Sequence, residues 1–117
     1  MDRLPDGMLS HDLLARAVSL ESEGVYDLAW CREDALRVIH LAADVSVGIL
    51  GVTVWVERAG RWSVPGDGWY CEPFADESSE AFARRSCSGA AAYVTDHPMR
   101  KPWFGRPRRY VYDIGFQ

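Results

Sequence analysis

The stretch Val45–Cys71 constrains the fold of this chain more than any other, because it gathers β-branched and indole side chains in strict alternation. A period of two places successive side chains on opposite faces of a strand. One face is aliphatic and consists of Leu50, Val52, Val54 and Val56. The other face is mixed and consists of Gly51, Thr53, Trp55 and Glu57. We therefore expect the aliphatic face to meet the core of the domain.

The residues that follow predict that this strand turns back on itself. Ala59-Gly60 is a tight-turn signal, and residues 61–64 supply the returning strand. Residues 65–68 all favour turns, so they interrupt the pairing as a bulge or a loop. An extended run resumes at residues 69–71. The whole stretch is thus predicted to be a hairpin on which the rest of the domain packs.

Helical spacing of apolar residues is found on both sides of the hairpin. It predicts a helix over residues 11–22, with Ser10 as its N-cap and an end near Gly24. A second helix is predicted over residues 32–44, and its two early acids complement the positive end of the helix dipole. A third is predicted over residues 77–97.

Two further segments complete the expected order of elements. Pro98 is predicted to end the third helix, and residues 98–108 read as a long loop that is rich in proline and glycine. Residues 110–116 alternate aromatic or aliphatic with smaller or polar side chains, which predicts a last strand. The expected order is α-α-β-β-α-β.

These elements favour one α+β domain over residues 1–117, with residues 1–9 and 98–108 flexible. We expect a small antiparallel sheet of about three to four strands, with the helices packed on one face. The opposite face would then be open and would carry Thr53, Trp55, Glu57 and Asp113. In an alternative arrangement, Trp55 closes a second small core on that face.

No catalytic or metal-binding set is recognisable in the sequence. The three cysteines (Cys31, Cys71 and Cys87) are widely spaced and favour reduced, partly buried thiols. The three histidines lie in different segments, without a second ligand at metal-binding spacing. No Gly-x-Ser-x-Gly elbow or phosphate-binding glycine loop occurs. We therefore expect no enzyme activity, no metal and no cofactor.

The charges are distributed unevenly along the chain. Residues 1–96 hold sixteen acids and eight arginines, whereas residues 97–117 hold five bases and one acid. An acidic body favours a basic partner and argues against a nucleic-acid-binding domain. Residues 100–110 interleave bases with aromatics, as a nucleic-acid contact does, but a solvated loop that pairs with the acidic body is the preferred interpretation.

The same composition bears on location and assembly. The first residues lack the basic and apolar regions of a secretory signal, and no apolar run approaches the roughly 18 residues of a membrane span. We expect a cytoplasmic protein without a membrane partner, present as a monomer or weak dimer.

An acidic block directly follows the hairpin. Five acids and no base lie between Trp62 and Ala83: Asp67, Glu72, Asp76, Glu77 and Glu80. Such a block is usually a solvated face. Next to exposed indoles, however, carboxylates are well placed to capture a basic protein.

The chain resembles family 40 of the immunity proteins of bacterial polymorphic toxin systems. The resemblance covers residues 20–116 and is carried by short apolar and aromatic segments: Gly24-Val25, Ala29-Trp30, residues 49–55, residues 68–72, Glu77-Ser78, Arg85-Ser86 and residues 92–94. The first strand of the family often reads Leu-Gly-Gly-Asp-Val-Tyr, and here Val52-Thr53 replaces the second glycine and the aspartate. If that aspartate binds toxin in relatives, the contact differs in this chain.

The resemblance implies a protein that binds a cognate toxin and blocks it without chemistry. The acidic block fits a basic toxin. We expect the contact to include Trp55, Glu57, Asp67, Trp69, Glu72, Asp76, Glu77 and Glu80. Reversing the charges of Asp76 and Glu77 is expected to slow association. The alternative is a small nucleic-acid-binding or regulatory module that uses residues 100–110.

Overall fold

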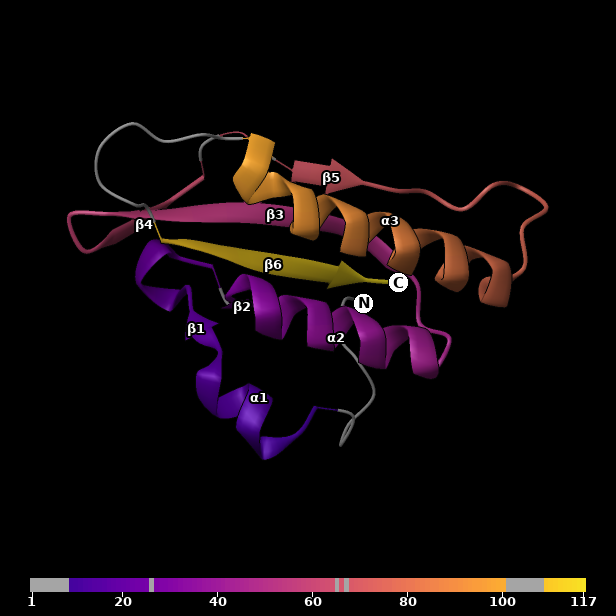
Figure 1. Cartoon of the computed structure of the whole chain (residues 1–117), viewed down its shortest axis with the longest axis horizontal. Coiled ribbons are helices and arrows are strands. Elements are labelled where there is room, and N and C mark those ends of the chain that lie inside the picture. The colour runs from indigo at the N-terminus through magenta and orange to yellow at the C-terminus, as the bar shows by residue number, and fades with distance from the viewer. Residues whose placement is uncertain (1–8, 26, 65, 67, 101–108) are drawn as a thin grey trace.

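The computed structural model describes residues 9–25, 27–64, 66, 68–100 and 109–117, the side chains of 98–100 excepted. The fold is α+β, with three helices and a six-stranded antiparallel sheet that curls into a half-barrel (Figure 1). The elements in chain order are α1 (His11–Arg16), β1 (Val18–Ser19), the 3-10 helix η1 (Glu21–Glu23), β2 (Leu28–Trp30), α2 (Arg32–Asp44), β3 (Ile49–Arg58), β4 (Arg61–Ser63), β5 (Gly68–Tyr70), α3 (Ser79–Arg100) and β6 (Tyr110–Phe116). The predicted class is confirmed, whereas the predicted sheet is too small.

The two strands that were not predicted, β1 and β2, lie in the N-terminal part of the chain. Ser10 caps α1 as expected, because its Oγ accepts a hydrogen bond from Leu13 N at 3.2 Å. The helix ends at Arg16, however, and Ala17 is already extended. Leu20 is fully buried on the sheet face opposite α2 and α3. Its burial outweighs the helical pattern of residues 11–22, so that prediction is wrong beyond the first six residues.

Strand β3 organises the sheet, as the alternation in its sequence predicts. Along one edge it pairs with β6, from Ile49 opposite Phe116 to Val56 opposite Tyr110. Along its other edge it pairs with β5 near its start and with β4 near its end. The strand order is β1-β2-β6-β3-β4, with β5 beside β3. Ala59 and Gly60 both have positive φ, which is the geometry of the predicted tight turn.

The main core lies between one face of this sheet and the helices, as predicted. Figure 1 shows α2 and α3 side by side across β3 and β6. Val52 and Val54 are fully buried against apolar residues of both helices. Trp30 joins α1 to this core, because its Nε1 donates a hydrogen bond to the carbonyl of Leu13 at 2.9 Å.

The opposite face of the sheet holds a second, smaller core. It consists of Leu20, Ala29, Trp55 and Val111, with Val18, Val25 and Trp62 packed around it. Trp55 is therefore 8% exposed, and the alternative in which it closes a second core is confirmed.

The pairing of β3 with β6 is irregular at its start, where the register shifts between Ile49 and Gly51. This irregularity turns Ile49 into the main core and leaves Leu50 36% exposed, so the prediction that Leu50 belongs to the aliphatic face is wrong.

The third predicted helix is longer than expected. Helix α3 continues through Pro98 to Arg100, so Pro98 does not end it. Pro98 has no N–H to donate to the carbonyl of Val94, so the helix continues past it without that backbone hydrogen bond. Of the predicted loop, residues 98–100 belong to α3 and residues 101–108 lie outside the described part. Among the described helices, none is both long enough and apolar enough to span a membrane.

Candidate partner-binding surface

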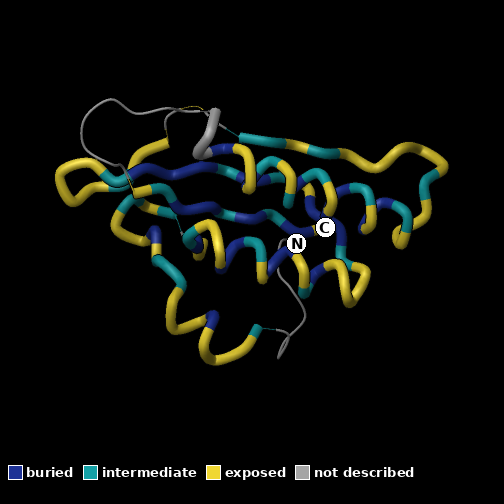
Figure 2. The backbone as a smooth tube through the Cα atoms, viewed as in Figure 1, coloured by how far each residue is buried: buried dark blue, intermediate teal, exposed yellow. Residues whose placement is uncertain are grey.

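An exposed acidic segment connects β5 to α3. We call residues 71–78, together with the first turn of α3, the acidic arm (Figure 1). Glu72, Asp76 and Glu80 are exposed on it, and Figure 2 shows exposure along most of its length. Phe74, between these acids, is 63% exposed. Three of the acids predicted from the sequence thus lie on one accessible segment, around an aromatic side chain that the prediction had omitted.

The acidic arm is held in place by Arg85 of α3. The guanidinium of Arg85 donates to both carboxylate oxygens of Glu77 (at 2.9 and 2.7 Å) and to the carbonyl of Glu72 at 2.7 Å. It also lies 4.0 Å from the centre of the Phe74 ring. Glu77 in turn accepts a hydrogen bond from Phe74 N at 3.0 Å. Glu77, which was predicted to contact the partner, is engaged in shaping the arm.

The hydrogen bonds from Arg85 lower the pKa of Glu77 to about 2, and those from Arg16 lower the pKa of Asp34. A carboxylate whose pKa is lower in the folded than in the unfolded protein stabilises the fold above its unfolded pKa. We therefore expect the free energy of unfolding to fall as the pH drops from about 4.5 to 2. Urea unfolding at pH steps across this range measures this free energy. Glu77→Gln should reduce the slope of the free energy of unfolding against pH. An unchanged slope would contradict the assignment of this pH dependence to Glu77.

The two tryptophans of the predicted contact do not form an exposed surface. Trp55 lies in the second core, as described above. Trp69 faces α3, where a Cβ on Gly89 would lie 2.5 Å from its Cζ2. Tyr70 points to the opposite face and is 76% exposed. The same alternation that buries Trp69 could have identified Tyr70 as the exposed aromatic.

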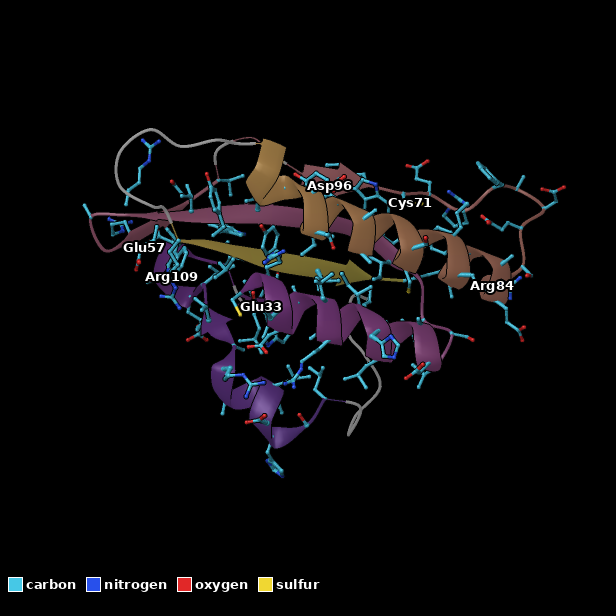
Figure 3. All side chains as sticks on the ribbon, in the orientation of Figure 1. Glu33, Glu57, Cys71, Arg84, Asp96 and Arg109 are labelled. Carbon is cyan, nitrogen blue, oxygen red and sulfur yellow. The ribbon has the colours of Figure 1, made fainter. Side chains whose placement is uncertain are left out.

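Glu57 lies far from the acidic arm. It pairs with Trp62 of β4, six residues along β3 from the point where Gly51 pairs with Tyr70. Six residues of extended strand span about 20 Å. Figure 3 shows Glu57 beside Arg109 at one end of the molecule, with Cys71 and Arg84 toward the other. The remaining predicted residue, Asp67, lies outside the described part of the chain.

A hollow of about 230 Å³ lies on the sheet face that carries Tyr70. Its lining comes from β3, β5, β6 and the residue just before β2: Asp27, Leu50, Gly51, Thr53, Tyr70, Asp113, Ile114 and Gly115. Thr53 and Asp113 had been placed on this face from the alternation, and that placement agrees with the structure. The prediction omitted Asp27, which precedes a strand that the sequence did not reveal.

The described residues provide little for covalent or metal chemistry. No group of three or more potential metal ligands occurs among them. Burial raises the pKa of the Cys31 and Cys87 thiols, so both are protonated and weakly nucleophilic at neutral pH. His97 is buried, and its Nδ1 lies 3.1 Å from the hydroxyl of Tyr112 among three tyrosine rings.

Exposed aromatic side chains beside carboxylates make the acidic arm and β5 the candidate partner-binding surface of this fold. The family model of immunity protein 40 matches residues 19–104, which is most of the chain, and the chain belongs to this family. Searches of the curated proteins and of the solved structures found no match. Immunity families are typically toxin inhibitors without catalytic activity, and the chain is accordingly not an enzyme.

Proposed function

We propose that this protein binds a cognate toxin directly and neutralises it by covering its functional surface. Family membership implies toxin neutralisation, and the acidic arm supports a direct electrostatic contact. The toxin surface that it fits is basic, because Glu72, Asp76 and Glu80 are exposed and no base lies on the arm itself. The attachment of the arm to α3 through Arg85 is the single observation that carries this proposal.

An ordered arm favours binding, because ordering a loop during binding costs free energy. The cost is about 0.5–1.5 kcal/mol for each side chain that becomes immobilised. Arg85 spans Glu72 and Glu77 across the arm in the free protein. The three exposed acids are therefore already displayed before the toxin arrives. Carboxylates arranged in this way accelerate encounter with a positive surface and fix its orientation.

The double substitution Asp76→Lys/Glu80→Lys tests this contact. The partner is the purified product of the adjacent toxin gene, and the measurement is stopped-flow association at low and high salt. We expect the association rate constant to fall about 10-fold at low salt, because steering of this size is lost when charges are reversed. The difference should shrink as salt screens the charges. Glu77 is left intact because its reversal would also release the arm.

The matched control is Glu21→Lys/Glu33→Lys. It changes the net charge equally, but η1 and the start of α2 lie away from the arm (Figure 3). An equal slowing by both double variants would mean that net charge alone steers the toxin. Failure of the wild-type protein to bind this product or to rescue cells from it would contradict direct neutralisation.

The nucleic-acid alternative gains no support from the described part of the basic segment. The guanidinium of Arg109 lies 5.2 Å from the Trp62 ring, so it contacts the body of the protein. This contact concerns Arg109 alone, and residues 101–108 lie outside the described part of the chain.

A further inference from the structure

The hollow on the sheet face opposite α2 and α3 has the size of a side-chain pocket. Its volume of about 230 Å³ is that of about eight water molecules at ~30 Å³ each. That is enough for one long side chain but not for a helix, which is about 10 Å across. The hollow lies next to β5, and the acidic arm follows directly from that strand. A partner that contacts the arm could therefore reach it.

The floor of the hollow is a pair of glycines in register, Gly51 and Gly115. Gly115 does not have a positive φ, and a Cβ added there would meet only the carbonyl oxygen of Gly51, at an ordinary 3.8 Å. Neither backbone conformation nor crowding by described atoms therefore requires glycine at this position. Glycine within a strand lowers stability and often marks a place where a ligand approaches the backbone.

The walls of the hollow are suited to a cation. Asp27 and Asp113 both line it, and its described lining contains no lysine or arginine. Asp113 already interacts within the chain, but a carboxylate has about four acceptor sites and can accept further hydrogen bonds. The ring of Tyr70 lies against the backbone at Gly51 and Gly68 and remains 76% exposed. An aromatic face beside two carboxylates matches a planar guanidinium, which stacks and donates at the same time.

The geometry points to this hollow as the receptor for an arginine side chain of the cognate toxin. The inference rests on the proposed function and deepens it. The arm attracts the toxin electrostatically at long range, and the hollow binds one of its side chains specifically. A guanidinium between Asp27 and Asp113 would donate to both carboxylates above Gly115, where the missing Cβ leaves room for the arginine side chain.

Gly115→Val fills the hollow and is the first test. Because a Cβ fits at this position, we expect the midpoint of urea unfolding to stay the same or rise. The affinity for the purified product of the adjacent toxin gene should fall about 10-fold or more. Ala92→Val, on an exposed position of α3, adds similar bulk elsewhere and should bind like the wild type. If Gly115→Val folds and binds the toxin as tightly as the wild type, the inference is wrong.

The double substitution Asp27→Asn/Asp113→Asn keeps the inference testable if Gly115→Val does not fold. We expect about a 10- to 100-fold loss of affinity, because the toxin arginine would be buried in the complex without a carboxylate partner. Asp44→Asn, on α2, controls for the loss of one carboxylate away from the hollow. Substituting each arginine of the toxin by alanine should reveal one whose effect disappears in the double variant. If no toxin arginine couples in this way while the wild type still binds, the hollow is not the seat and the proposed function stands.

Discussion

Replacing Gly89 by alanine is expected to destabilise the protein by about 2 kcal/mol, although the same change inside a helix normally stabilises by about 1 kcal/mol. Gly89 lies in the middle of α3, where the ring of Trp69 packs against the helix backbone. A Cβ would meet Trp69 Cζ2 at 2.5 Å and Cη2 at 3.2 Å, so the indole must move. Trp69 borders the main core, and its displacement would loosen β5 from α3.

Chemical denaturation measures this effect, with Ser88→Ala as a control on the adjacent, exposed position of the same helix. In the Trp69→Leu background, Gly89→Ala should lose most of its cost, because the smaller side chain leaves room for the methyl group. If Gly89→Ala alone stabilises the protein, the packing of the Trp69 indole does not require a glycine at this position.

Arg85→Ala is expected to weaken toxin binding about 10-fold through faster dissociation, even though it makes the surface more acidic. Electrostatic steering alone would predict faster association of a basic toxin with this variant. The loss arises because Arg85 holds Glu77, the Glu72 carbonyl and the Phe74 ring in one arrangement. Without it, the arm must be ordered during binding.

The association and dissociation rate constants of Arg85→Ala separate these two effects, with Arg84→Ala as the matched control. Arg84 is exposed on the same helix and has the same charge. If the two variants bind equally, the fixed arm contributes nothing beyond charge. If Arg85→Ala binds more tightly than the wild type, steering outweighs preorganisation.

Long periodic segments could be predicted from the sequence, because their patterns record burial directly. Val52 and Val54 lie on the core face of β3 as expected, and α2 has the predicted bounds. Strands β1 and β2 have only two and three residues, too few for a period to show. They exist because their backbones pair beside β6 and because Leu20 and Ala29 close the second core. These long-range contacts leave no local pattern.

The candidate surface could be predicted only in outline. The acidic block and the face of Thr53 and Asp113 follow from sequence order and alternation, so both were found. The roles of Glu77 and Trp69 depend on Arg85 and Gly89, which come from a helix that packs back against them. Separation in sequence therefore concealed which acid is a structural anchor and which aromatic is covered. Gly89, an unfavourable residue in the middle of a helix, is explained by the tryptophan that it accommodates.

The central claim is that the acidic arm and the open sheet face form the toxin contact. Backbone hydrogen exchange of the free protein and of its complex with the adjacent gene's product tests this most directly. We predict added protection along residues 70–80 and around Gly51 and Gly115, with α1 and the exposed side of α2 unchanged. Protection confined to the helices, with the arm and the glycine floor exchanging as in the free protein, would contradict the account.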